Sequence, residues 1–319
     1  MPTVGGVDLG ATNLRAAVAV GRDGPDGVER RPTPQGDDGE AVAASVTDAL
    51  ADASAMAGLD PGELTAVGVG TIGPLDRDAG AVVEPPNLAG VERMPLRDEL
   101  ATFVGRDRVY VENDAVAGLV GERSARAHPP ADLVYLTLST GIGAGVAVDG
   151  HVLRGRRGNA AEVGHLVVDP AGRRTCGCGR PGHWEAYCAG AAIPGLARDL
   201  ASGGSRGTDL DLDDPALSAA DVLGAAGDDP LADRVVERVR GYNAIGLANV
   251  VHAYAPDRIA VGGAVALENR SLLVDPMAGA VAEHAILDVP AIEPAVHGHD
   301  AVLRGALALA RSGGIDSRP

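Results

Sequence analysis

The sequence predicts an α/β fold with mixed sheets. Short apolar runs, typical of strands, alternate along the chain with Ala-rich segments whose apolar residues recur at helical spacing. Hydrophobic residues make up 45% of the 319 residues but aromatic residues only 2%, so the core must be built from Ala, Val, Leu, Ile and Gly. This length suits one large domain or two of ordinary size.

The N-terminal part of the chain predicts strands that alternate with helices. Apolar runs indicate strands at residues 4–9, 14–20, 66–69 and 108–111. Residues 40–57 are Ala-rich with apolar positions at helical spacing, and Asp60-Pro61-Gly62 ends this helix. Further helices are expected at residues 95–103, and from near Asp114 to the prolines at 129 and 130.

The C-terminal part continues this alternation around a long irregular segment. Strands are expected at residues 133–138 and 144–148, around a glycine turn, and at 258–261. Helices are expected at residues 230–254, after the glycines that follow Val261, and at 300–311. Residues 155–185 predict an irregular segment that carries His, Cys and Glu, and residues 203–215 predict an acidic, Gly-rich surface loop.

The chain is strongly acidic. Its formal net charge is -17 at pH 7, and all 27 of its basic residues are arginines. Such a surface repels nucleic-acid phosphate, so we expect no nucleic-acid partner. Two explanations of the acid excess stay open: the codon usage of a GC-rich genome, and adaptation to high salt, which screens the self-repulsion of an acidic surface. We favour the second, halophilic explanation.

The sequence shows no sign of a membrane or secreted protein. No stretch of about 18 uncharged apolar residues is present, and the N-terminus has no basic region followed by an apolar run. The three cysteines, Cys176, Cys178 and Cys188, do not suggest a disulfide framework. We therefore expect a cytoplasmic protein without a membrane partner.

Two glycine-rich turns, each directly after a predicted strand, are typical of phosphate binding. The segments Asp8–Thr12 and Ser139–Gly145 both combine a hydroxyl with glycines, whose backbone can approach a phosphate closely. Asp8 would contact a metal ion or its water. The first turn is not a P-loop, because no Gly-Lys-Ser/Thr follows, and an ordinary hairpin turn stays an alternative for it. Two such turns together suggest phosphate-holding hairpins that face each other across a cleft.

Glu112-Asn113-Asp114 lies at a predicted strand-to-helix junction. A carboxylate suits this position as a helix cap, and that structural explanation of Asp114 stays open. The functional alternative is a general base that accepts a proton from a substrate hydroxyl, with Asn113 holding the hydroxyl in place.

Four side chains of the irregular segment have the chemistry of zinc ligands. They are His165, Cys176, Cys178 and His183. Two imidazoles and two thiolates suit a tetrahedral zinc ion, which is structural because the protein fills all four positions. Such an ion would hold the carboxylates of Glu162 and Glu185 in place. The alternative for the Cys pair is a pair of small buried residues, and Cys188 is expected to be a buried apolar residue.

A third glycine pair follows the predicted strand that ends at Val261. Without side chains, the backbone at Gly262 and Gly263 can admit an adenine ring or a ribose. The same strand-Gly-Gly-helix connection is also common where no nucleotide binds.

Together these motifs resemble the ROK family of sugar kinases. The resemblance runs from residue 4 to about residue 311, with DLGATN, GVGTIGPLD, ENDA, LSTGIGAG, EVGH, CGCGRPGHWE and IAVGGA in the family's order and approximate spacing. It implies a two-lobed sugar kinase fold of the actin-like ATPase (ribonuclease H-like) class, with the active site in the cleft. The small lobe would contain residues 1–114 and 300–319, and the large lobe residues 115–299 with the zinc-binding loop.

The resemblance also implies a role for individual residues. Asp114 matches the catalytic base, and His165 matches a zinc ligand that Cys176 and Cys178 follow. The residues that match sugar-binding positions are Gly73, Asn87, Asn113, Asp114, Glu162, His165 and Glu185. Those that match nucleotide- and phosphate-binding positions are Asp8, Gly10, Thr12, Asn13, Thr140, Gly141, Gly143, Gly262 and Gly263.

Two residues depart from the family pattern. His183 stands where the zinc motif usually has Cys, and because histidine also binds zinc we expect a site of two Cys and two His, with Cys188 as the alternative fourth ligand. Ile72 replaces the proline of the family's G-x-P-G sugar loop, which bears on the shape of the sugar side but not on the class of protein.

The implied reaction is ATP-dependent phosphorylation of glucose to glucose 6-phosphate. Mg²⁺ and the two glycine turns would neutralise the phosphates, Asp114 would take the proton of the 6-hydroxyl, and closure of the lobes would exclude water. Other acceptors stay open, namely a broader hexose range, fructose, N-acetylmannosamine or other N-acetylhexosamines, as do ADP and polyphosphate as donors. The family further implies a homo-oligomer, a dimer or tetramer.

Two classes other than a kinase are disfavoured. Sugar-sensing regulators of the family carry a DNA-binding helix-turn-helix ahead of the first phosphate turn, and we expect none ahead of Asp8. A non-catalytic sugar-binding or metal-binding protein would need neither the two phosphate turns nor Asp114.

Overall fold

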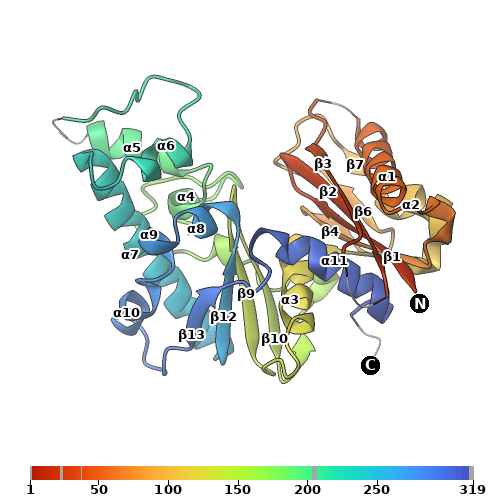
Figure 1. Ribbon diagram of the computed structural model, residues 1–319. Helices are drawn as coiled ribbons and strands as arrows, with labels where there is room; N and C mark the ends of the chain where they lie inside the picture. The colour runs from red at the N-terminus through yellow and green to blue at the C-terminus, as the bar shows by residue number, and fades with distance from the viewer. Residues whose placement is uncertain (1, 22–23, 37, 203–206, 316–319) are drawn as a thin grey trace. The chain divides into compact units, whose positions relative to one another are not determined.

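The computed structural model describes residues 2–21, 24–36, 38–202 and 207–315 (Figure 1). The chain divides into two compact units. The first contains Met1–Pro129, Val152–Ala160 and Asp300–Pro319, and the second contains Pro130–His151 and Ala161–His299. Strands and helices alternate in both units and the sheets are mixed, which confirms the predicted α/β fold.

A mixed five-stranded sheet forms the centre of the first unit. Its strands, in spatial order, are β3 (Gly27–Pro32), β2 (Asn13–Val20), β1 (Thr3–Leu9), β4 (Ala66–Thr71) and β8 (Val109–Asn113). β3, β2 and β1 pair antiparallel, whereas β1, β4 and β8 run parallel. A separate small antiparallel sheet contains β5 (Leu75–Asp76), β6 (Ala81–Val83) and β7 (Arg93–Met94).

Helices cover both faces of this sheet, because its apolar side chains alternate between them. The helices are α1 (Gly39–Met56), α2 (Leu96–Val104), α3 (Asp114–Ser124) and α11 (Ala301–Ser312). Gly5 of β1 faces Leu50 of α1, whereas the next residue, Gly6, faces Leu307 of α11. The larger core lies on the α1 side and consists almost entirely of Val, Leu and Ala side chains.

Helix α3 belongs to the first unit because it packs closely on α11. A Cβ on Gly305 of α11 would lie 1.7 Å from the carbonyl oxygen of Ala117 in α3, so only glycine allows this approach. A lobe boundary at residue 114 would separate these two helices; in the structure the first unit continues to Pro129.

The second unit contains another five-stranded mixed sheet. In spatial order its strands are β11 (His151–Val152), β10 (Ile142–Val148), β9 (Leu133–Leu138), β12 (Arg258–Gly262) and β13 (Ala291–Pro294). β9 and β10 form an antiparallel hairpin, and β12 pairs parallel to both β9 and β13.

Most helices of the second unit pack on the long helix α7, whereas α8 packs on strands β9 and β12. The helices of this unit are α4 (Glu185–Cys188), α5 (Ile193–Ser202), α6 (Ala219–Gly224), α7 (Pro230–Tyr254), α8 (Ala264–Glu268), α9 (Arg270–Leu273) and α10 (Met277–Ala282). Helix α7 coincides with the predicted helix at residues 230–254. Its N-cap is Asp229, whose carboxylate accepts from the N–H groups of Leu231 and Ala232 at 2.8 and 2.9 Å.

The predicted irregular segment is confirmed. Between residues 155 and 184 the structure has two short 3-10 turns, Arg156–Gly158 and Val163–His165, and no helix or strand longer than these. The predicted surface loop at 203–215 is described only from residue 207 onward, where it has no helix or strand; residues 203–206 lie outside the described part. No helix among the described residues has both the length and the apolar character needed to cross a membrane.

Candidate functional site

The first glycine turn joins β1 to β2 and begins with a buried carboxylate. Asp8 is 8% exposed and accepts a hydrogen bond from the guanidinium of Arg15, which also donates to Asp300 Oδ1 at 3.1 Å. Burial raises the pKa of Asp8, and the charge of Arg15 opposes this shift. Sequence reasoning missed both partners, since Asp300 comes from the opposite end of the chain.

The backbone of this turn is that of a hairpin. The Gly10 N–H donates to the Asn13 carbonyl at 2.9 Å, and the Gly10 carbonyl accepts from Thr33 Oγ1 at 2.7 Å. The side chains of Thr12 and Asn13 are exposed. The ordinary hairpin interpretation is therefore correct as geometry, and the turn still presents a hydroxyl and an amide for binding.

Asn113 and Asp114 lie at the junction of β8 and α3. Asn113 is the N-cap, and its side-chain oxygen accepts from the Ala115 N–H at 3.0 Å; Asp114 Oδ1 accepts from the same N–H at 2.8 Å. The cap is thus Asn113, so capping alone does not explain Asp114. The Gly73 loop lies beside the junction, where a Cβ on Gly73 would be 3.9 Å from Asn113 Nδ2. Asn87 lies apart from them in sequence, in an exposed turn between β6 and β7.

Glu112, next to this junction, is held by two arginines that the motifs did not indicate. It is 5% exposed and accepts from the guanidinium of Arg77, and from Arg154 Nη2 at 3.3 Å. Burial raises the pKa of Glu112, and both arginines oppose the shift. Arg154 lies in the segment Val152–Ala160, so Glu112 ties this segment to the rest of the first unit.

The second glycine turn joins β9 to β10 in the second unit. The Ser139 N–H donates to the Gly141 carbonyl at 2.9 Å, and Thr140 at the tip is exposed. At the end of the turn the Ile142 N–H donates to Glu185 Oε2 at 2.9 Å. This contact brings Glu185, from the end of the irregular segment, onto the turn.

The other candidate glycines have a packing reason of their own. A Cβ on Gly262 would lie 2.3 Å from the Tyr135 hydroxyl, and a Cβ on Gly263 would lie 2.3 Å from the Leu138 carbonyl oxygen. The close approach of β12 and α8 to β9 therefore requires both glycines, whether or not a nucleotide binds. Gly143 lies within β10, one residue after Ile142.

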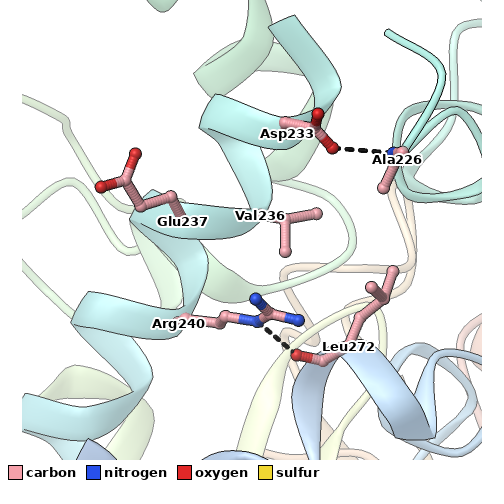
Figure 2. A pocket seen from close by; sticks show the side chains of 7 residues that line it. Ala226, Asp233, Val236, Glu237, Arg240 and Leu272 are labelled. Carbon is pink, nitrogen blue, oxygen red and sulfur yellow. Dashed lines mark hydrogen bonds between the residues drawn. The ribbon is translucent and has the colours of Figure 1, made fainter. Parts of the chain in front are cut away.

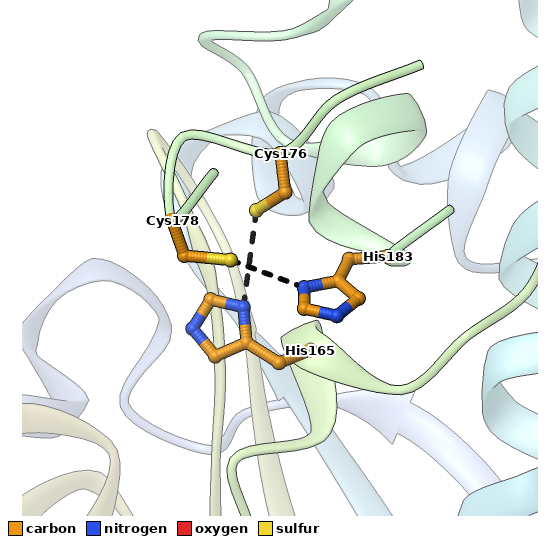
Figure 3. A group of neighbouring side chains, drawn as sticks. All are labelled: His165, Cys176, Cys178 and His183. Atoms are coloured by element: carbon orange, nitrogen blue, oxygen red, sulfur yellow. Dashed lines mark hydrogen bonds between the residues drawn. The ribbon is translucent and has the colours of Figure 1, made fainter. Parts of the chain in front are cut away.

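The four candidate zinc ligands converge. Figure 3 shows His165, Cys176, Cys178 and His183 turned toward one another, and their ligand atoms all lie within 4.8 Å of one another. Cys176 Sγ is 3.8 Å from His165 Nδ1, and Cys178 Sγ is 3.2 Å from His183 Nδ1. Tetrahedral zinc, with bonds of about 2.0–2.3 Å, separates its ligand atoms by about 3.3–3.8 Å, so the donor set fits zinc.

The surroundings of the cluster agree with this fit. Burial raises the pKa of the Cys176 thiol to about 11, so zinc binding at neutral pH would displace its proton. His165 Nε2, on the other side of its ring, lies 4.0 Å from Glu162 Oε2. The thiol of Cys188 is buried elsewhere and donates to the Val239 carbonyl at 3.4 Å, so Cys188 is not part of the cluster.

A buried hydrogen-bond network supports the loop that carries these ligands. Asp169 is 4% exposed and accepts from the Tyr187 hydroxyl at 2.7 Å and from the N–H groups of Ala171 and Arg173, both at 3.1 Å. The Tyr187 oxygen in turn accepts from the Arg174 N–H at 3.0 Å. The loop before Cys176 is therefore fastened to α4 by contacts that need no metal.

Figure 2 shows a surface hollow of about 390 Å³ between α7 and the segments around residues 226 and 272. Arg240 Nε donates to the Leu272 carbonyl at 2.6 Å, and Asp233 Oδ1 accepts from the Gly227 N–H at 2.7 Å. None of the predicted site residues lines this hollow. It therefore adds nothing to the candidate site.

Comparison with known proteins places the chain among sugar kinases. The model of the ROK family matches residues 4–312. A glucokinase from Aeropyrum pernix is 39% identical over 286 residues, which cover 86% of this chain and 85% of that protein. A solved ROK hexokinase from Thermus thermophilus has a TM-score of 0.76 at 35% identity, covering 97% of this chain and 98% of its own. A solved ROK family glucokinase from Streptomyces griseus, in complex with glucose and AMPPNP, has a TM-score of 0.78 at 29% identity, covering 97% and 99%. These structures confirm the predicted actin-like ATPase fold.

The network around Asp169 leads to a prediction about Tyr187→Phe. Loss of the hydroxyl leaves the buried Asp169 carboxylate without one donor, which should lower the free energy of unfolding by about 1–3 kcal/mol at neutral pH. Burial, together with the bond to Asp169, raises the pKa of Tyr187 from 10.0 to about 12. As pH rises, the Tyr187 hydroxyl loses its proton in the unfolded chain before it does so in the folded protein. The extra unfolding free energy of wild type over Tyr187→Phe should therefore shrink as pH rises from 10 to 12. Urea unfolding across this pH range measures both effects.

The matched control is Tyr242→Phe. The Tyr242 ring stacks on Tyr187 with centroids 4.2 Å apart, but its hydroxyl bonds to no group among the described residues. We expect a change below about 0.5 kcal/mol. Equal losses in the two variants would contradict the assignment of the effect to Asp169.

Proposed function

Because this chain belongs to the ROK family and is a sugar kinase, we propose that it transfers the terminal phosphoryl group of ATP to the 6-hydroxyl of glucose. The observation that carries the proposal is the junction at which Asn113 and Asp114 lie beside the Gly73 loop. An acceptor hydroxyl needs one group that orients it and one that removes its proton, and an amide next to a carboxylate supplies both. Similarity to glucokinases supports glucose and ATP as the substrates.

Asp114 would act as the general base. As the 6-oxygen of glucose forms its bond to the γ-phosphorus, Asp114 takes the hydroxyl proton, and the bond from the γ-phosphorus to the bridging β-phosphate oxygen breaks to release ADP. Phosphoryl transfer asks for little covalent chemistry from the protein. Orientation of the acceptor and neutralisation of charge therefore supply most of the rate.

The two glycine turns would hold the nucleotide. Mg²⁺ bound with ATP would neutralise phosphate charge, and Asp8, which also pairs with Arg15, would contact that ion or its water. Gly262 and Gly263 would border the adenosine. The full set proposed for the nucleotide is Asp8, Gly10, Thr12, Asn13, Thr140, Gly141, Gly143, Gly262 and Gly263.

The sugar would be bound by hydrogen-bonding side chains. The set proposed for it is Gly73, Asn87, Asn113, Asp114, Glu162, His165 and Glu185. His165 would serve twice, because Nδ1 faces Cys176 and Nε2 faces Glu162 on the other side of the ring. Such fixed polar groups orient the acceptor, which makes the transfer effectively unimolecular.

We further propose that His165, Cys176, Cys178 and His183 hold a structural zinc ion. With four protein ligands the ion has no open position for substrate, so it would cross-link the irregular segment rather than take part in the chemistry. The separations of the donor atoms support this proposal.

A kinase of broader hexose range is the second candidate, because the Thermus thermophilus structure at 35% identity is a hexokinase. Fructose, N-acetylmannosamine and N-acetylglucosamine are the further acceptors to be tested. The acidic composition also supports function at high salt, since a net charge of -17 is self-repelling in dilute buffer.

A coupled assay of ADP release tests the proposed acceptor. With Mg²⁺ and ATP we expect kcat/KM for glucose to exceed that for each other sugar by at least about tenfold, because unpaired polar groups penalise a sugar with a misplaced hydroxyl. Activity should be higher in molar KCl than in dilute buffer. Comparable rates on several hexoses would favour the hexokinase, and no activity on any sugar in either buffer would reject ATP as the donor.

Substitution of Asp114 tests the proposed base. Asp114→Asn should lower kcat at least about 100-fold, because the amide cannot accept the proton, while glucose binding by calorimetry stays within a few-fold of wild type. Asp48→Asn, on the exposed side of α1, is the control and should leave kcat unchanged. If Asp114→Asn turns over normally, Asp114 is not the base.

Metal analysis tests the proposed zinc site. We expect a single zinc ion per chain, and His183→Ala should lose it and lower Tm by several degrees, because the cross-link between the ligand segments is gone. Cys188→Ala should keep the zinc, since the Cys188 thiol lies outside the cluster. If His183→Ala keeps the zinc and Cys188→Ala loses it, Cys188 is the fourth ligand.

A further inference from the structure

The second glycine turn is contacted at Ile142 by two other segments of the chain. The Ile142 N–H donates to Glu185 Oε2 at 2.9 Å. The carbonyl oxygen of the same residue lies against Gly164, where a Cβ would be only 2.3 Å away. The carboxylate also fills the space above Gly141, since a Cβ there would lie 2.8 Å from Glu185 Oε2. Ile142 therefore contacts both the segment that contains Gly164 and the segment that contains Glu185.

Both of these segments also carry ligands of the Cys/His cluster. Gly164 directly precedes His165, and Glu185 follows His183 by two residues. Glu185 moreover reaches the cluster with its other oxygen, since Oε1 lies 3.8 Å from Cys176 Sγ. The Glu185 carboxylate thus connects Cys176 of the cluster to the second glycine turn.

The residues after α4 extend the same contact. The Gly190 N–H donates to the Ser139 carbonyl at 2.8 Å, and the Ala191 N–H donates to the Thr140 carbonyl at 3.2 Å. Residues 183–191 therefore bond to the start of the turn, through Gly190 and Ala191, and to its end, through Glu185. A shift of residues 183–191 would therefore also shift the backbone of residues 139–142.

From this geometry we infer that Glu185 is a positioning residue that couples the metal cluster to the phosphate turn, so that zinc and nucleotide strengthen each other's binding. The inference rests on the proposed function for the identity of both ligands. Zinc would cross-link the two segments that contact Ile142 and keep the turn in its binding conformation. Without zinc the turn samples more conformations, and nucleotide binding must then restrict them.

Linkage makes the coupling measurable from both sides. Zinc-free wild type should bind Mg²⁺·AMPPNP about tenfold more weakly than the zinc-loaded protein, in the usual range for coupled sites. By reciprocity, saturating nucleotide should tighten zinc binding by the same factor. Calorimetry measures the first effect in the absence of sugar, and competition with a chelator measures the second.

Three variants assign the coupling to Glu185. In Glu185→Ala the coupling factor should fall well below that of wild type, because no side chain then joins Ile142 to the cluster and only the backbone contacts at Gly164, Gly190 and Ala191 remain. Glu185→Gln should recover part of the coupling, since its amide oxygen can still accept from the Ile142 N–H. Glu237→Gln, at an exposed position of α7, is the control and should keep the full factor, because Glu237 belongs neither to the cluster nor to the turn. An unchanged factor in Glu185→Ala, or independent affinities in the wild type, would overturn the inference.

Amide exchange of wild type provides a readout that needs no nucleotide. The Ile142 amide should exchange at least about tenfold faster in the zinc-free protein, because its acceptor is no longer fixed. Equal exchange with and without zinc would overturn the coupling. If exchange responds to zinc but AMPPNP does not bind, the coupling of the turn to the metal stands and the proposed ATP donor fails.

Discussion

The parallel pairing of β1, β4 and β8 is the constraint on which the site of the first unit depends. Parallel strands end at the same edge of a sheet, so chemistry that follows each of them collects in one place. The register sets Asp8 beside Gly70 and Gly70 beside Glu112, and the next residues continue into the first glycine turn, the Gly73 loop and α3. In the second unit β9 and β12 are parallel in the same way, which brings the second turn next to Gly262. Residues far apart in the sequence become neighbours because of strand order alone.

Such an edge leaves carboxylates poorly solvated, and arginines compensate for this. Asp8 pairs with Arg15, and Glu112 pairs with Arg77 and Arg154. Loss of one of these arginines would leave a buried carboxylate without its partner, so the pairs hold their strands in place. Because the chain contains no lysine, each cation is a planar guanidinium, which can bond to two acceptors at once as Arg15 does with Asp8 and Asp300.

Strong local signals explain which parts could be predicted from the sequence. Helix α7 has an Asp cap, a proline at its first position and a long amphipathic pattern, and the prediction is right at both ends. Strand β3 (GVERRP) was missed because it is an edge strand with charged residues and only one buried position. Helix α5 was missed because Pro and Gly stand in its first turn, where proline is tolerated. The short sheet β5–β7 and strand β13 offer too few residues for a periodic pattern.

The site motifs could be found from the sequence because glycine after a strand predicts a tight turn, and closely spaced His and Cys predict metal ligands. Arg77, Arg154 and Asp300 were missed because an ion pair between distant residues leaves no periodic pattern.

The Cys/His cluster matters beyond the stability of its own loop, because its neighbours are shared. His165 turns one ring nitrogen to Cys176 and the other toward Glu162, so a metal ion that fixes the ring also fixes the direction of its second nitrogen. Glu185 divides its two oxygens between the Ile142 N–H and the neighbourhood of Cys176. A sugar that binds to His165 and Glu185 would therefore contact side chains whose orientation depends on both the cluster and the second glycine turn. Under the proposed function, the orientation of these groups depends on one small segment of irregular structure, which the buried hydrogen bonds of Asp169 and Tyr187 also hold in place.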